Sequence, residues 1–199
     1  MKLTIIGASG HGKVIADIAQ KVGYDEVEFL DDNASLSGCA GYPVVGKSKE
    51  AFSIENDLFF AIGDAKIRRN LTEKCQGKQI PVLIHPSAVI AEDVFIGAGS
   101  VVMAGAVINP GTILGQSCII NTCSSVDHDC IVGDFVHVAV GAHLCGHVTV
   151  GDNTWIGAGA TVSNNIMVCG NSMIGAGAVV VKNLEEAGTY VGVPAKIIK

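Results

Sequence analysis

IAEDVFIGAGSVVMAGAVINPGTILGQSCIINTCSSVDHDCIV, residues 90–132, places a branched aliphatic residue at every sixth position. The spacing continues without an insertion to Val180, which makes sixteen successive repeats counted from Ile90. A fixed short period is typical of a stacked repeat, in which each unit buries its apolar face against its neighbours. A period of six fits neither an amphipathic helix nor a half-buried strand. The sequence therefore predicts short strands joined by tight corners, each strand lying on one face of a prism.

The corners of this prism have a signature of their own. Gly or Asn directly follows the aliphatic residue in many repeats, as at Gly97, Asn109 and Gly115. Both residue types tolerate the positive φ of a sharp corner, so we expect positive φ at these positions. Because no insertion breaks the period, we also expect no extruded loop between residues 86 and 182.

Outward side chains of the repeat fall into columns. Because side chains alternate across a strand, the residue before each aliphatic residue points outward, and residues eighteen apart share a face. Two columns are mostly apolar: Val101, Ile119, His137, Trp155, Met173 and Phe95, Ile113, Ile131, Thr149, Met167. Exposed apolar faces need a partner, and two different faces that cover one another close into a ring. We expect a homotrimer that buries these side chains between chains: Phe95, Ile113, Ile131, Ile119 and Trp155.

Composition narrows the classes of function and location. The chain of 199 residues carries a net charge of −6, and residues 79–181 contain no Lys or Arg, which argues against a nucleic-acid partner. The uncharged stretch 94–126 is interrupted by Gly, Ser, Asn, Gln and Pro, which argues against membrane insertion. LTIIG follows Lys2 where a secretory signal would have a long apolar core, and the seven cysteines form no CxxC pair. We therefore expect a cytoplasmic protein with reduced thiols.

A β-α-β pattern occupies the first third of the chain. LTII (3–6) predicts a buried strand, GASGHG (7–12) a glycine loop, and residues 13–22 a helix. The loops after parallel strands form the usual ligand edge of such a sheet, and a glycine loop before a helix can bind phosphate. We expect the nucleotide part of a substrate to lie on Ser9, Gly10, His11, Asp31, Asp32 and Gly63. The alternative is a glycine turn that only packs the strand on the helix.

The repeat region resembles the hexapeptide-repeat family of left-handed parallel β-helices, most of whose members are trimeric acyltransferases. The whole chain resembles bacterial sugar acetyltransferases of the sialic-acid O-acetyltransferase and UDP-amino-sugar N-acetyltransferase type, the latter from bacillosamine synthesis and pilin glycosylation. The matching segments, in order, are IIGASGHGKV (5–14), FLDD (29–32), FFAIGD (59–64), LIHPSA (83–88), SSVDHDCIVGDFVHVAVGA (124–142) and YVGVPAK (190–196).

This resemblance implies a fold of two domains, each of which binds one of the two substrates. An α/β, Rossmann-like N-terminal domain (1–83) is expected to bind a nucleotide sugar. A left-handed parallel β-helix (84–199) is expected to bind acetyl-CoA between the chains of a homotrimer. The implied reaction is transfer of the acetyl group of acetyl-CoA to the amino group of a nucleotide-linked deoxy-amino-sugar, for bacterial surface glycan or glycoprotein synthesis.

Individual residues receive roles from the same resemblance. His128 corresponds to the general base, which takes a proton from the acceptor as the acceptor attacks the thioester. A histidine suits this task because its ordinary pKa lies near neutral pH. Asp129 stands where the family usually has Glu and is expected to orient the ring, with Asp127 as the alternative. Both carboxylates flank the base directly in the sequence.

Acetyl-CoA is the expected co-substrate, and no metal is expected. His137 matches the residue that contacts the thioester region. Gly146 matches the position whose backbone amide faces the thioester oxygen, as an oxyanion donor would. Ala158 and Ala176 match small residues along the pantetheine groove.

Three other functions remain open from the sequence. An O-acetyltransferase acting on a sialic acid or another sugar hydroxyl would use the same base. A zinc enzyme, like the carbonic anhydrases that share this fold, could use His137, His143, His147 and Cys145, although His137 and His143 fall on different faces. A non-catalytic trimeric scaffold would keep the repeat but would not need the His128–Asp129 pair.

Overall fold

The computed structural model describes residues 1–198. Contacts between Cα atoms divide the chain after Pro86 into an N-terminal unit and a C-terminal unit. Among the described residues, no helix combines the length and the hydrophobicity that crossing a bilayer requires.

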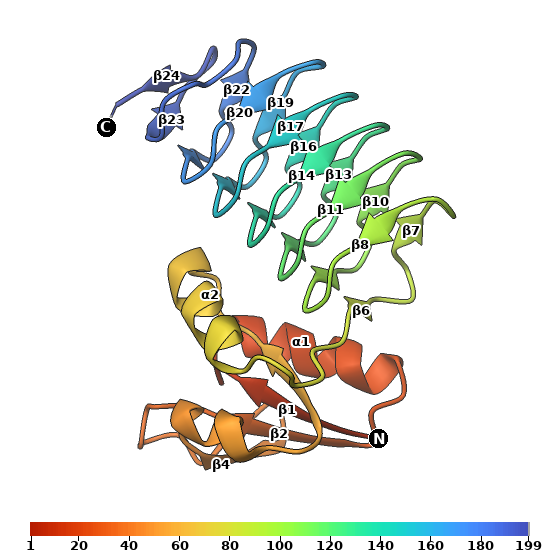
Figure 1. Ribbon diagram of the computed structural model, residues 1–199, viewed down its shortest axis with the longest axis vertical. Helices are drawn as coiled ribbons and strands as arrows, with labels where there is room; N and C mark the ends of the chain where they lie inside the picture. The colour runs from red at the N-terminus through yellow and green to blue at the C-terminus, as the bar shows by residue number, and fades with distance from the viewer. Residues whose placement is uncertain (199) are drawn as a thin grey trace. The chain divides into compact units, whose positions relative to one another are not determined.

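The N-terminal unit is built on a five-stranded sheet with the order β3-β4-β2-β1-β5 (Figure 1). Strand β1 lies between β2 and β5 and is parallel to both. Both faces of such a strand are buried, which is why LTII is mostly apolar, and the hydroxyl of its buried Thr4 donates to Oε1 of Glu28 at 2.8 Å. The elements of this unit are β1 (Lys2–Ile6), α1 (Gly10–Lys21), β2 (Glu26–Leu30), β3 (Gly38–Cys39), β4 (Tyr42–Gly46), η1 (Ser48–Ser53), β5 (Asp57–Phe60), α2 (Ala65–Lys74) and β6 (Leu83–Ile84).

Helix α1 begins earlier than the sequence predicted, at Gly10 instead of Lys13. The amide of Lys13 donates to the carbonyl of Ser9 at 3.0 Å, which places Ser9 at the N-cap. Gly12 therefore lies in the first turn, where a Cβ atom would lie 2.2 Å from the carbonyl oxygen of Gly7. The glycine loop is compact because the helix packs directly on the end of β1.

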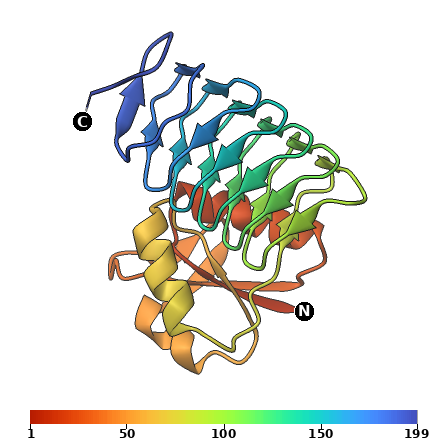
Figure 2. The same ribbon diagram turned by 45° about the horizontal axis from the view of Figure 1, so that its top comes forward.

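The C-terminal unit is a solenoid of parallel strands (Figure 2). From β7 to β19, each strand pairs with the strand three places later, so that residues eighteen apart are neighbours on one face, as Ser125 and His143 are. One strand of two residues falls in every hexapeptide: β7 (Val89–Ile90), β8 (Phe95–Ile96), β9 (Val101–Val102), β10 (Val107–Ile108), β11 (Ile113–Leu114), β12 (Ile119–Ile120), β13 (Ser125–Val126), β14 (Ile131–Val132), β15 (His137–Val138), β16 (His143–Leu144), β17 (Thr149–Val150), β18 (Trp155–Ile156), β19 (Thr161–Val162), β20 (Met167–Val168), β21 (Met173–Ile174) and β22 (Val179–Val180), followed by β23 (Thr189–Val191) and β24 (Lys196–Ile197).

This arrangement confirms the predicted fold class, an α/β N-terminal region followed by a left-handed parallel β-helix. The aliphatic residue of nearly every repeat is buried in one continuous core, as Val126 and Leu144 are. Most of the small residues two places earlier are buried as well, and some of their hydroxyl groups bond to the next coil. Ser100 Oγ donates to the carbonyl of Gly115 at 3.0 Å, which satisfies a polar group inside the core.

The corners differ from the sequence prediction. Positive φ occurs three residues after the inward aliphatic residue, for example at Gly99 and Asp129, and not at the residue that directly follows it. Gly97 is needed for another reason, because a Cβ atom there would lie 2.5 Å from the amide nitrogen of Gln116 in the next coil. Glycine after the aliphatic residue thus permits close stacking of coils, while the positive φ is adopted further along the corner.

The outward columns have the predicted register, but their exposure is uneven. Phe95, Ile113 and Ile131 are exposed by 61%, 50% and 53%, which leaves an apolar stripe on one face of the chain. Ile119 is only 2% exposed in the single chain. The expectation that a partner chain buries Ile119 is therefore wrong, because that side chain is already covered.

Candidate active site and nucleotide pocket

His128 lies at the corner between β13 and β14, and the backbone of neighbouring coils fixes this corner. The amide of Asp129 donates to the carbonyl of Pro110 in the preceding coil at 3.0 Å. The amide of His147 in the following coil donates to the carbonyl of His128, also at 3.0 Å. Asp129 and His147 both have positive φ and lie eighteen residues apart, so their side chains project from the same point of successive corners.

Asp129 is the carboxylate that contacts the proposed base. Its Oδ2 lies 2.8 Å from Nδ1 of His128, so the shorter aspartate side chain does reach the ring. This hydrogen bond, supported by the negative charge of Asp127, raises the pKa of His128 above its ordinary value. Asp127 has another task, because its Oδ1 accepts from the amide of His128 and from Nδ2 of Asn109, each at 2.8 Å.

Gly146 and His147 complete the surroundings of the His128 ring. A Cβ atom on Gly146 would lie 2.6 Å from Nε2 of His128, so glycine at this position leaves room for the ring. The ring of His147 stands edge-on to that of His128 with centroids 5.2 Å apart, and its Nε2 lies 3.6 Å from Oδ2 of Asp129. The contact between His147 and His128 was not predicted, although His147 lies eighteen residues after Asp129, which is the spacing of neighbours in successive coils.

His137 is on a different sheet, in β15, and has different partners. Its Nε2 lies 3.0 Å from Nδ2 of Asn121, and its ring centroid lies 4.2 Å from that of Trp155. The side chain is 7% exposed. Asn121 was missed by the sequence analysis, since its spacing of sixteen from His137 is not a multiple of the repeat.

A groove on the C-terminal coils brings together two of the four residues expected to bind acetyl-CoA. Its volume is about 310 Å³, and Ala158 and Ala176 both line it beside Trp155. His137 adjoins this groove through its ring contact with Trp155. Gly146 is placed apart from them, at the corner of His128.

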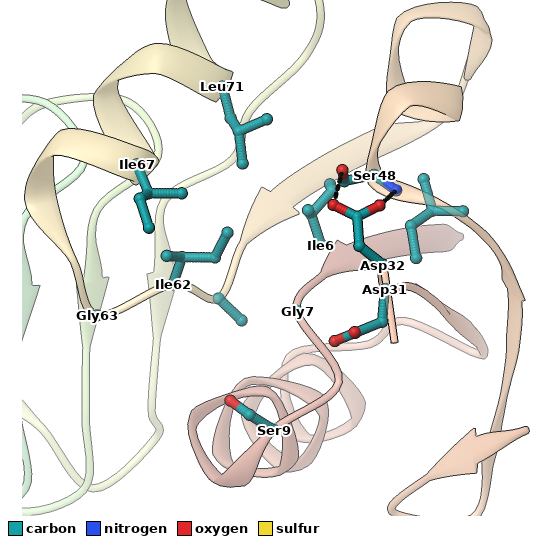
Figure 3. A pocket seen from close by; sticks show the side chains of 12 residues that line it. Ile6, Gly7, Ser9, Asp31, Asp32, Ser48, Ile62, Gly63, Ile67 and Leu71 are labelled. Atoms are coloured by element: carbon teal, nitrogen blue, oxygen red, sulfur yellow. Dashed lines mark hydrogen bonds between the residues drawn. The ribbon is translucent and has the colours of Figure 1, made fainter. Parts of the chain in front are cut away.

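The N-terminal unit has a pocket of about 380 Å³ at the carboxyl ends of its parallel strands (Figure 3). Ser9, Asp31, Asp32 and Gly63 line it, as the sequence predicted, while Gly10 and His11 are not among its lining residues. The full lining is Ile6, Gly7, Ser9, Leu30, Asp31, Asp32, Ser48, Ala61, Ile62, Gly63, Ile67 and Leu71.

The two aspartates of this pocket are held by hydrogen bonds within the protein. Oδ2 of Asp31 accepts from the amide of Ala8 at 2.7 Å, which ties the glycine loop to the end of β2. Asp32 accepts from both the amide and the hydroxyl of Ser48, at 3.1 and 2.7 Å. These bonds hold the pKa of Asp32 below its ordinary value, so the carboxylate is a fixed acceptor at the pocket edge.

His11 is a packing residue in this structure. Its Nε2 is buried, and burial together with the charge of Arg68 lowers the pKa of His11 to about 4, so the ring is neutral. Arg68 itself is 1% exposed and donates through Nη1 to the carbonyls of Ile62 and Gly63, at 2.7 and 2.9 Å. It thereby shapes the pocket edge at Gly63. The sequence analysis missed Arg68, because a charged residue within a helix gives no sign that it is buried.

The residues considered for a zinc enzyme do not form one cluster. His137 is in β15 and His143 in β16, which belong to different sheets, and Nδ1 of His143 lies 2.8 Å from Oγ of Ser125. His147 lies instead beside Asp129. The structure therefore separates His137 and His143, as expected from their faces.

Comparison with known proteins identifies the family of the chain. A family model described as the PglD N-terminal domain matches residues 2–75. The GDP-perosamine N-acetyltransferase of Escherichia coli O157:H7 is 30% identical over an alignment of 156 positions, which covers 73% of this chain and 71% of that protein.

Two solved structures extend the likeness over the whole chain. The acetyltransferase domain of PglB from Neisseria gonorrhoeae FA1090, in complex with acetyl coenzyme A, is 42% identical with a TM-score of 0.96, covering 99% of this chain and 98% of that chain. PerB from Caulobacter crescentus, in complex with CoA and GDP-perosamine, is 36% identical with a TM-score of 0.95, covering 100% of this chain and 98% of that chain. The resemblance inferred from the sequence is confirmed, and the chain belongs to the family of acetyl-CoA-dependent sugar N-acetyltransferases.

Proposed function

We propose that this protein transfers the acetyl group of acetyl-CoA to the amino group of a nucleotide-linked deoxy-amino-sugar, such as a UDP- or GDP-linked 4-amino-sugar. The observation that carries the proposal is the hydrogen bond between Nδ1 of His128 and the carboxylate of Asp129, at the exposed corner of the β-helix. The relatives supply the context, since PerB was solved with CoA and GDP-perosamine and the PglB domain with acetyl-CoA.

His128 acts as the general base through Nε2. In this role Nδ1–H donates a hydrogen bond to Asp129 and keeps its proton, which leaves the lone pair of Nε2 free to accept a proton from the sugar amine. The amine nitrogen attacks the thioester carbonyl, the C–S bond breaks, and the thiolate of CoA leaves and takes up a proton. The amide of Gly146, beside Nε2, is proposed to stabilise the oxyanion of the tetrahedral intermediate.

Acetyl-CoA is proposed to lie along the groove of Ala158 and Ala176, with its thioester end near His137. The exposed stripe of Phe95, Ile113 and Ile131 supports a homotrimer, because exposed apolar faces of this kind mark contacts between proteins. In that trimer one active site takes His128 from one chain and His137 from its neighbour.

The nucleotide of the acceptor is proposed to occupy the pocket of the N-terminal unit, which makes residues 1–83 a nucleotide-sugar domain and residues 84–199 the acyltransferase domain. Ser9 and Asp32 would bind polar groups of the nucleotide at the edge of this pocket. The described cysteines are all free, and we propose a cytoplasmic location, where thiols stay reduced.

O-acetylation of a sugar hydroxyl remains the second candidate, because His128 would serve a hydroxyl in the same way. The names of the relatives favour the amine, since GDP-perosamine N-acetyltransferase acts on nitrogen. The distinguishing experiment incubates the protein with acetyl-CoA and a panel of UDP- and GDP-linked 4-amino-sugars, with sialic acid as the hydroxyl acceptor, and follows release of free thiol. We expect turnover with an amino-sugar only. Thiol release with sialic acid and with no amino-sugar would contradict the proposal.

A further inference from the structure

Three side chains of types that can bind a metal ion lie together at the proposed base. One ligand atom each from His128, Asp129 and His147 lie within 4.8 Å of one another. Oδ2 of Asp129 is the centre of this group, at 2.8 Å from Nδ1 of His128 and 3.6 Å from Nε2 of His147. Zinc bonds to nitrogen and oxygen are about 2.0–2.2 Å long, so ligand atoms around a tetrahedral ion lie roughly 3.3 Å apart. Small rotations of these three side chains are enough to close around one ion.

The backbone holds these three residues at positions from which their side chains can surround one ion. Asp129 and His147 occupy the same point of successive corners, and the His147 amide bonds to the carbonyl of His128. Two imidazoles and one carboxylate are a donor set that suits zinc, and three protein ligands leave a fourth position for water. The three side chains are exposed by 47%, 52% and 56%, so an ion can reach them from solvent.

We propose that zinc binds Nδ1 of His128, Oδ2 of Asp129 and Nε2 of His147, and that this inhibits the enzyme. A neutral imidazole bound to a metal through Nδ1 keeps its proton on Nε2. Nε2 is the nitrogen that must accept the proton of the sugar amine, so the metal-bound ring cannot act as a base. Zinc also takes the carboxylate that orients the ring. Neutral His128 loses no proton when zinc binds, and a protonated His128 or His147 ring each loses one proton.

Binding is tested first, without any activity measurement. Zinc chloride is titrated by calorimetry into metal-free, reduced protein, for the wild type, His147→Asn and His143→Asn. His143 is the matched control, because it is an exposed histidine on another face that contacts Ser125. We expect zinc to bind His147→Asn at least about tenfold more weakly, since even the loss of an outer-sphere partner costs that much, and to bind His143→Asn as tightly as the wild type. Equal affinity in the wild type and His147→Asn would overturn the site.

Inhibition is tested second, and this part rests on the proposed function. The rate of each variant in zinc is divided by its own rate without zinc, so that a change in basal rate does not matter. We expect the zinc concentration for half-inhibition to rise at least about tenfold in His147→Asn and to stay unchanged in His143→Asn. Equal inhibition of the wild type and His147→Asn would overturn the inhibitory role. A protein without acetyl transfer in the absence of zinc would refute the proposed function, while the calorimetric result would still decide the metal site.

Discussion

At the scale of single residues, the two nitrogens of His128 have separate partners. Nδ1 contacts the carboxylate of Asp129 at 2.8 Å, and Nε2 faces the position where Gly146 has no side chain. A general base needs this arrangement, because one nitrogen must be fixed by a hydrogen bond while the other stays open to the substrate. Removing either half of the arrangement has a different kinetic consequence.

Replacing His128 by alanine should lower kcat by roughly 10²–10⁴-fold, the usual contribution of a positioned general base. The KM for acetyl-CoA should change little, because the groove of Ala158 and Ala176 is separate from this corner. Steady-state kinetics of His128→Ala beside His143→Ala measure both effects. Acetyl transfer at the wild-type rate in His128→Ala would favour the non-catalytic scaffold.

Replacing Asp129 by asparagine should move the pH dependence of the reaction. The bond to Asp129 raises the pKa of His128, and the base works only when it is deprotonated, so the wild-type rate falls as pH drops through this raised pKa. In Asp129→Asn the His128 pKa should fall, and the acidic limb of the kcat/KM profile should shift to lower pH. The plateau rate should also fall, because the ring loses its orientation. An unshifted limb would mean that Asp129 does not act on the base.

The sequence predicted these residues to different extents. His128 and Asp129 stand out because the DHD segment directly follows the uncharged stretch 94–126 and falls at a corner of the repeat. Asn121 contacts His137 from outside the eighteen-residue column, and Arg68 is buried by packing around α2, so neither contact follows from local sequence. The role of His11 as a neutral packing residue likewise depends on its burial beside Arg68.

At the scale of elements, the repeat made the β-helix predictable, because each hexapeptide buries its side chains at the same positions. The register of every strand pair follows once one sheet is placed, as Val107 with Ser125 and Ser125 with His143 show. The N-terminal unit has no such redundancy. The start of α1 was misplaced because Ser9 caps it without a side-chain hydrogen bond, and glycines at positions 10 and 12 suggested a loop.

This helix start gives a prediction about stability. Gly12→Ala should destabilise the N-terminal unit by about 1–3 kcal/mol, because its Cβ atom would lie 2.2 Å from the Gly7 carbonyl oxygen and 3.0 Å from the Phe29 ring. Gly10→Ala is the control, since a Cβ atom there meets nothing within 4 Å and alanine has a higher helix propensity than glycine. Urea denaturation should show a lower midpoint for Gly12→Ala and an unchanged or higher midpoint for Gly10→Ala. Equal midpoints would mean that the loop can open around the added methyl group.

At the scale of the whole molecule, the nucleotide pocket and the catalytic corner should contribute separately to kinetics. Asp32→Ala removes an acceptor at the pocket edge and releases Ser48. The KM for the nucleotide sugar should rise about tenfold or more, since loss of a fixed hydrogen bond to a charged group costs roughly 1.5–3 kcal/mol. The KM for acetyl-CoA should stay the same. Equal increases in both constants would indicate that the loop is structural and does not bind the nucleotide.

The proposed trimer makes a further prediction, which joins the two histidines. His137 and His128 have different partners within one chain, Asn121 and Asp129, and lie on different parts of the solenoid. If an active site takes one histidine from each of two neighbouring chains, then His128→Ala and His137→Ala subunits repair one another. In a random mixture about one interface in four unites an intact His128 with an intact His137, because each heterologous interface uses different faces of its two subunits.

Mixing the two variants, followed by unfolding and refolding to exchange subunits, should therefore restore roughly a quarter of the wild-type activity. Each variant treated alone in the same way is the control and should keep its own reduced activity. Sedimentation should show that wild type, variants and mixture all form trimers, held together by the exposed stripe of Phe95, Ile113 and Ile131. Mixed trimers without recovered activity would place both histidines in the site of one chain, and a stable monomer at micromolar concentration would remove the shared site altogether.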